Sequence, residues 1–235
     1  MAQHLKLIAL LIFTLSASYT SAQSLRKLLE RPYGIIGSKW EKDAQVDNPF
    51  KSASSYTFCR GKFPKDFNIQ TPYALPVKNN QKTAWKTDPR EPFKTLNFHI
   101  KQGDTIYATR SGIACKTTNP QQLLIYHPDQ TFAAYLVMNE NFIEPGEEVQ
   151  VGQAIGKAGP TGAAISFFFL DENKFKGGLS SGYPYSHFIP VFRTTEGDVK
   201  PEEKTIYQAV TDHDLIMQDM SKRNKKKYMK LHNLK

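Results

Sequence analysis

The chain has 235 residues, a net charge of +9 and 23% charged residues, which is the composition of an ordinary globular protein. The charge is unevenly spread, because residues Lys222 to Lys235 hold seven Lys/Arg and no acid. Without that segment and Lys6 the net charge falls to about +1, so the folded body is nearly neutral. This distribution argues against a nucleic-acid partner and confines the basic charge to a tail.

The N-terminus has the features of a secretory signal peptide. Lys6 precedes an apolar run from Leu7 to Leu15, and small residues continue to Ser21-Ala22. The run is too short to cross a bilayer core of about 30 Å, so we predict that residues 1–22 are removed and that the protein is exported, to the periplasm or the cell exterior. An uncleaved membrane anchor is the alternative.

Three regions are expected after the signal peptide. Residues 23–72 have an irregular pattern, which predicts a loop-rich extension that wraps the main domain. Between residues 73 and 193, short apolar runs alternate with Gly, Pro, Asn and Asp turns, which predicts a mainly β domain. Residues 194–235 are expected to be helical with a basic tail, with Asp212 as the helix N-cap and a frayed helix or disordered arm from Lys222. The predicted strands are Thr95–Ile100, Thr105–Thr109, Gly112–Thr117, Leu123–His127, Thr131–Met138, Glu148–Val151, Ala163–Asp171 and His187–Phe192.

The chain has two cysteines, Cys59 and Cys115. In an exported protein, two cysteines are expected to pair rather than to bind metal or act as nucleophiles. We therefore predict a Cys59–Cys115 disulfide that ties the extension to the β domain. The alternative is a pair of buried, unlinked thiols.

Four segments of the β domain carry a family signature, in the family's order. They are Gly103–Ala114, Leu123–His127, Thr131–Met138 and Glu144–Gly162, and the last has glycines at the most specific spacing. Together they resemble the lysostaphin/LytM-type peptidoglycan metalloendopeptidases (peptidase family M23, duplicated hybrid motif). The resemblance implies a partly open antiparallel β-barrel or sheet. Lipoyl and biotinyl domains share the glycine spacing, but this sequence lacks the hairpin that carries their modified Lys.

The resemblance also implies where a zinc site would lie. Family members bind Zn²⁺ through the His and Asp of H-x-x-x-D and through the second His of H-x-H. The first His of H-x-H and the His of Y-x-H assist the attacking water. Counting from the neighbouring segments places Phe93 and Asn97 at the first pair, Val137 at Y-x-H, and Ile165 and Phe167 at H-x-H. A catalytic zinc needs three N or O ligands and an open position. We therefore predict no bound metal, no cofactor and no peptidase activity.

The remaining histidines offer one alternative chemistry. His99, His127 or His187 could form a relocated metal site with Asp104 or Asp171. The competing interpretation is that each of these histidines is a surface or hydrogen-bonded residue.

The function implied by the resemblance is that of an exported, noncatalytic domain that binds a cell-envelope partner or peptidoglycan and regulates a true hydrolase. An active metallopeptidase with displaced ligands and a structural envelope protein are the alternatives. Strand alternation predicts that Ile165, Phe167 and Phe169 face the former cleft, where the N-terminal extension covers them as a plug or a partner binds. The tail Lys222 to Lys235 is expected to contact anionic envelope polymers or phospholipid headgroups.

Overall fold

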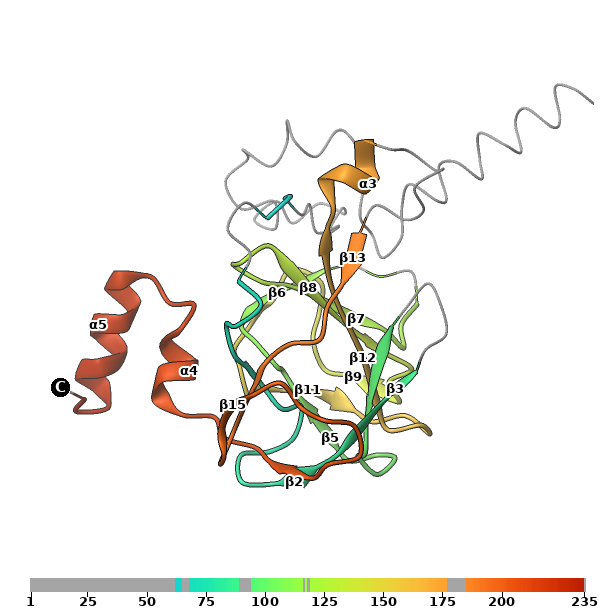
Figure 1. Cartoon of the computed structure of the whole chain (residues 1–235). Coiled ribbons are helices and arrows are strands. Elements are labelled where there is room, and N and C mark those ends of the chain that lie inside the picture. Colours follow the sequence, from blue (N-terminus) through green and yellow to red (C-terminus); the bar gives the residue numbers. More distant parts are fainter. Residues whose placement is uncertain are drawn as a thin grey trace, which may run out of the picture.

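The structure is a computed structural model that describes residues 62–64, 68–88, 94–115, 117, 119–176 and 185–234. Strands dominate these residues, and three short helices lie in the C-terminal part of the described chain (Figure 1). The strands are β1 (Tyr73–Ala74), β2 (Lys82–Thr83), β3 (Trp85–Asp88), β4 (Thr95–Phe98), β5 (Thr105–Tyr107), β6 (Gly112–Cys115), β7 (Leu123–Tyr126), β8 (Thr131–Leu136), β9 (Glu140–Asn141), β10 (Glu148–Val149), β11 (Ala154–Lys157), β12 (Ala163–Leu170), β13 (Tyr185–His187), β14 (Phe192–Thr194), β15 (Gly197–Val199) and β16 (Tyr207–Gln208). The helices are α3 (Glu172–Lys176), α4 (His213–Met217) and α5 (Lys222–Leu231).

The largest sheet has the strand order β10-β6-β7-β8-β12-β4-β3, and β13 also pairs with β12. Every pairing in this sheet is antiparallel. Smaller sheets have the orders β5-β11-β9, β1-β14-β15 and β16-β2. None of the described sheets closes on itself, so the predicted mainly β fold with an open antiparallel sheet is confirmed.

The predicted strands from Thr95 to Asp171 all contain an observed strand, whereas several short strands were missed. The strands β1, β2, β9 and β16 have two residues each, which is too short to show an alternating pattern. The expected strand His187–Phe192 is divided between β13 and β14. Strands also continue beyond residue 193, because β14 pairs with both β1 and β15 and β16 pairs with β2.

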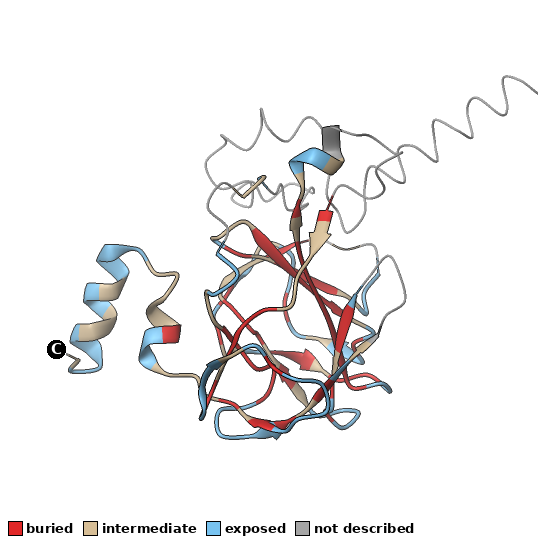
Figure 2. Cartoon of the chain, in the orientation of Figure 1, coloured by how far each residue is buried: buried red, intermediate tan, exposed pale blue. Residues whose placement is uncertain are grey.

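Strand β12 lies between β8 on one side and β4 and β13 on the other, and seven of its eight residues are buried. One face of β12 presents Ile165 and Phe167 to the main hydrophobic core. The other face presents Phe168 to a smaller cluster rich in aromatic residues. Buried residues fill the centre of the β domain, and α5 is largely exposed (Figure 2).

A buried ion cluster fastens the segment after α4 to the β domain. Arg110, which is 3% exposed, makes two 2.8 Å hydrogen bonds to the carboxylate of Asp219 and a salt bridge to Asp129. Its guanidinium also lies 5.0 Å from the centre of the Tyr73 ring, a cation–π contact. Because these residues come from four separate parts of the chain, the cluster holds the C-terminal region in register with the sheet.

The two C-terminal helices differ in how they are held. In α4, Asp212 accepts a 2.8 Å hydrogen bond from the Leu215 amide, so the predicted N-cap is confirmed, and Leu215 is buried. The expectation of a frayed helix or disordered arm from Lys222 is wrong. The segment forms the ten-residue helix α5, which Ser221 caps through a hydrogen bond from the Asn224 amide. Within the described residues, no helix is both long and apolar enough to cross a membrane.

His127 is buried beside this ion cluster in an uncharged form. Its Nδ1 donates a 2.8 Å hydrogen bond to the Ser111 carbonyl oxygen, and the Tyr73 ring meets the imidazole edge-on at 5.7 Å. Burial, assisted by the nearby Arg110 charge, lowers the pKa of His127 to about 4.

The His127 pKa predicts an acid-sensitive contribution to stability. The unfolded chain takes up the proton near pH 6.5 and the folded chain only near pH 4, so falling pH favours unfolding across this window. We expect the difference in unfolding free energy between the wild type and His127→Gln to fall by on the order of 3 kcal/mol from pH 7 to pH 4. Urea titrations across this range would measure it. A difference independent of pH would contradict the neutral burial of His127.

Candidate functional site

The sheet face that carries Asn97 is the candidate site, because Asn97 is the one potential metal ligand among the predicted positions. Asn97 pairs with Ala164 of β12, and Ala164 pairs with Leu136 of β8. Directly paired residues of antiparallel strands share a face, and residues two apart on a strand share it as well. One face of the sheet therefore carries Asn97, Ala164, Leu136 and Ser166.

The predicted placement of Ile165 and Phe167 on this face is wrong. Ile165 pairs with Leu96, and both residues belong to the main core on the opposite face from Asn97. The count from Gly162 was displaced by one residue, and with a period of two this reverses the face of every side chain. The residues that share the face with Asn97 at the H-x-H spacing are Ala164 and Ser166.

Val137 adjoins this face and has an unusual conformation. Its φ is +54°, the left-handed region that a β-branched residue rarely adopts, and its side chain is 46% exposed. Gly159 packs against the same turn, so closely that a Cβ on Gly159 would lie 1.8 Å from the Val137 carbonyl oxygen. The glycine of the family signature is thus required by close backbone approach to Val137.

The glycine turn also contacts the strand that carries Asn97. Gly162 has φ +90°, and a Cβ there would lie 2.4 Å from the Phe98 carbonyl oxygen. The turn from Gly159 to Gly162 therefore packs against backbone next to two of the predicted site positions, Asn97 and Val137.

Ser166 and His187 form a partly buried polar pair that the sequence did not predict. The Ser166 hydroxyl lies 3.0 Å from His187 Nδ1 and 3.4 Å from the Lys94 carbonyl oxygen. His187 reaches Ser166 because β13 pairs with β12 at Phe168. Nothing in the local sequence reveals this pairing, since Ser166 and His187 are 21 residues apart.

The other candidate ligands lie apart from this pair. His99 and Asp104 are exposed, and His127 is enclosed by the Arg110 cluster. Asp171 accepts hydrogen bonds from the Ser186 hydroxyl and from the first amides of α3, and these bonds, the Ser186 one foremost, lower its pKa. No group of three His, Cys, Asp or Glu suited to a metal occurs among the described residues.

The residues of this face do not fit the zinc that active members of the resembled family bind. Alanine and leucine side chains have no lone pair, and the Ser166 hydroxyl already contacts His187. Asn97 and His187 contribute at most two protein ligands, one fewer than a catalytic zinc site needs. Phe93, predicted at the first His position, lies outside the described residues.

Aromatic side chains fill the continuation of the same face. Phe168 stacks on Phe132 with ring centres 5.1 Å apart, and Tyr126 and Tyr185 pack beside them at 4.8 and 5.2 Å. Burial raises the pKa of Tyr126 to about 12. The surface where the predicted plug was expected is therefore apolar, although the residues that form it differ from those predicted.

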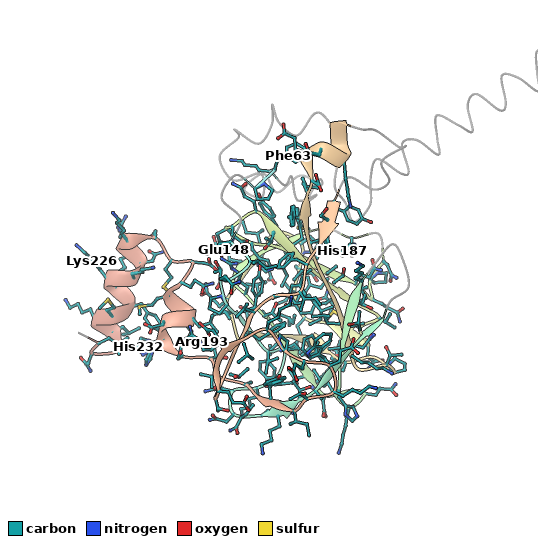
Figure 3. All side chains as sticks on the ribbon, in the orientation of Figure 1. Phe63, Glu148, His187, Arg193, Lys226 and His232 are labelled. Carbon is teal, nitrogen blue, oxygen red and sulfur yellow. The ribbon has the colours of Figure 1, made fainter. Side chains whose placement is uncertain are left out.

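A described part of the N-terminal extension contacts this aromatic cluster. Phe63 packs against it, and the Lys62 amide donates a 3.2 Å hydrogen bond to the Tyr126 hydroxyl. Figure 3 labels Phe63 and His187 toward the same end of the β domain. The contact agrees with a covering role for the extension at this point, and most of the remaining extension lies outside the described residues.

One of the two cysteines of the predicted disulfide lies among the described residues. Cys115 is 3% exposed at the end of β6, where it belongs to the aromatic cluster, whereas Cys59 lies outside the described residues. The Cys59–Cys115 bridge therefore stays a prediction.

A family model shows what the central part of the chain is similar to. Residues 91–169, which include β4 to β12, match the model of Peptidase family M23. This central segment is therefore similar to peptidase family M23. No curated protein matches the chain.

Solved structures similar to the M23 domain include three proteins of low identity. A novel M23 metalloprotease, pseudoalterin, from the deep sea is 15% identical over 41% of this chain and 68% of its own, with a TM-score of 0.34. A putative M23 peptidase from Pseudomonas aeruginosa is 18% identical over 56% of this chain and 59% of its own, with a TM-score of 0.35. Csd3 from Helicobacter pylori is 21% identical over 41% of this chain and 29% of its own, with a TM-score of 0.28.

The packing of the aromatic face predicts a large penalty for truncating Phe168. Phe168→Ala removes a fully buried ring and should lower the unfolding free energy by about 3–5 kcal/mol. Phe142→Ala is the matched control, because Phe142 is 43% exposed and its truncation should cost less than about 1 kcal/mol. Urea unfolding of both variants measures the difference. Equal, small losses would mean that the face is open rather than packed.

The disulfide is tested by counting thiols. Denatured, unreduced protein that has folded under oxidising conditions should show no reactive thiol, and reduction should release two. In the chain-entropy model, a loop of this length contributes on the order of 4 kcal/mol to stability. Two reactive thiols before reduction would rule out the bridge.

Proposed function

We propose that this protein is an exported, noncatalytic M23 domain that binds peptidoglycan or a protein of the cell envelope, and that it regulates a true hydrolase by this binding. The observation that carries the proposal is the register that puts Asn97 beside Ala164 and Leu136. At these positions the chain offers one amide and two aliphatic side chains. A site without three ligands cannot hold and activate a zinc-bound water.

The conformation of Val137 supports a binding role for the same region. A β-branched residue with positive φ stores backbone strain of about 1–3 kcal/mol, and such strain clusters at functional positions. Val137 is also exposed, although apolar, and it adjoins the face that carries Asn97. We infer that the Val137 side chain contacts the bound partner.

Export is supported by the sequence features of residues 1–22, in which Lys6 precedes a short apolar run followed by small residues. These features are independent of the M23 site. They support a partner among the components of the cell envelope.

The proposed binding is tested with purified sacculi and, in parallel, with envelope extract as bait. Val137→Asn removes the apolar contact, and Asn suits the left-handed conformation, so the fold should be retained. Binding of the protein to sacculi, or to its partner from the extract, should fall about tenfold or more; this binding is called capture below. Ile206→Asn is the matched control, because Ile206 is an exposed apolar residue on a different loop and should leave capture unchanged. An active M23 endopeptidase serves as the positive control for the release of muropeptides.

The outcomes separate the proposal from its alternatives. Capture that depends on Val137, without muropeptide release, supports a noncatalytic binding domain. Muropeptide release that a chelator abolishes would show an active peptidase with displaced ligands. Absence of capture from both baits would overturn the binding role and leave a structural envelope protein.

A further inference from the structure

Except for the half-buried Lys225, helix α5 carries its positive charge on one side. At 100° per residue, its exposed basic side chains fall within an arc of about 140°. The helix contains no acidic residue that would neutralise them. We call this arc the cationic face; it consists of Lys222, Arg223, Lys226, Lys227 and Lys230, all exposed.

The opposite side of α5 is the side that packs on the protein. Tyr228 and Met229 are half-buried there, and the Tyr228 hydroxyl lies 2.9 Å from His213 Nδ1 at the start of α4. The His232 ring packs on the Tyr228 ring with centres 4.2 Å apart. Since α4 is itself anchored by Leu215 and by the Arg110–Asp219 ion pair, the cationic face has a fixed direction, away from α4.

The arrangement of positive charges lowers the stability of α5. Lys222, Lys226 and Lys230 are spaced four residues apart, and like charges at this spacing repel each other. Lys222 also lies in the first helical turn, where a cation opposes the helix dipole. A helix that is formed in spite of this repulsion, with its charges on one exposed side, is suited to an external anionic surface that relieves the repulsion.

We propose that the cationic face of α5 docks the protein on an anionic phospholipid membrane. Three observations favour a membrane over a soluble polyanion. The row from Lys222 to Lys230 extends about 12 Å along one side of a helix that lies clear of the β domain (Figures 1 and 3), a convex surface suited to a plane. The body of the protein is nearly neutral, so it adds little attraction for a soluble polyanion that reaches beyond α5. Leu231, which is 77% exposed, follows the row and supplies an apolar side chain for the headgroup region.

The proposal is independent of the M23 site, so its failure would leave the proposed function intact. Binding of the whole purified chain is measured at low salt with vesicles of phosphatidylcholine alone or mixed with phosphatidylglycerol. Each Lys near an anionic surface strengthens binding by about fivefold, so changing Lys222, Lys226 and Lys230 to Gln should weaken it on the order of 100-fold. Gln preserves helix propensity, and circular dichroism checks that α5 is retained.

A matched variant separates the cationic face from net charge alone. Changing the exposed Lys78, Lys82 and Lys101 to Gln removes the same charge from the body and should weaken binding by less than about threefold. Equal losses in the two triple variants, or wild-type binding that does not require phosphatidylglycerol, would overturn the proposal. Leu231→Gln should weaken binding to vesicles but not to soluble polyphosphate. Wild-type binding to polyphosphate without binding to vesicles would assign the cationic face to a polyanion instead.

Discussion

The pairing of β12 with β4 on one side and β8 on the other is the constraint on which the rest of this structure depends. In a strand that is buried on both faces, register alone decides which side chains enter the main core and which meet the opposite cluster. Ile165 and Phe167 enter the core, and Ala164, Ser166 and Phe168 take the face of Asn97. The chemistry at the predicted zinc-ligand positions follows from this register, because it places aliphatic side chains beside the Asn97 amide.

Backbone packing explains how the glycines of the signature can be kept where the predicted ligand positions hold no histidine. The glycines of the signature are required by the fold rather than by the metal. Gly159 and Gly162 allow a turn to press against the backbone of Val137 and Phe98, and a Cβ at either glycine would collide with a carbonyl oxygen. Ligand positions carry no such packing requirement, so they can change while the turn is kept. The strained Val137 is a product of this turn, and it is where we expect binding to act.

Much of the fold could be predicted from the sequence, because alternating apolar runs and turn residues are local signals. The span Ala163–Asp171 was predicted almost correctly, but the two faces of the strand were exchanged. The turn from Gly159 to Gly162 leads directly into β12, and no residue in the sequence marks whether Ala163 or Ala164 shares the face of Asn97. The Ser166–His187 contact depends on a long-range strand pairing that has no local signature. The charged tail was expected to be a frayed helix or a disordered arm. Its repulsive charges are visible in the sequence, whereas the capping by Ser221 and the packing of Tyr228 become evident only in the structure.

The central claim is that the face of Asn97 cannot hold a catalytic zinc ion, and crystals grown with excess zinc test it most directly. Anomalous difference maps recorded at the zinc absorption edge locate every bound ion without assuming its ligands. The account predicts no peak within coordination distance, about 2.0–2.2 Å, of the Asn97 side chain or of His187. Zinc at exposed histidines such as His99 would not affect the claim. A fully occupied zinc ion bound by Asn97, His187 and a third ligand, with an open coordination position, would contradict it.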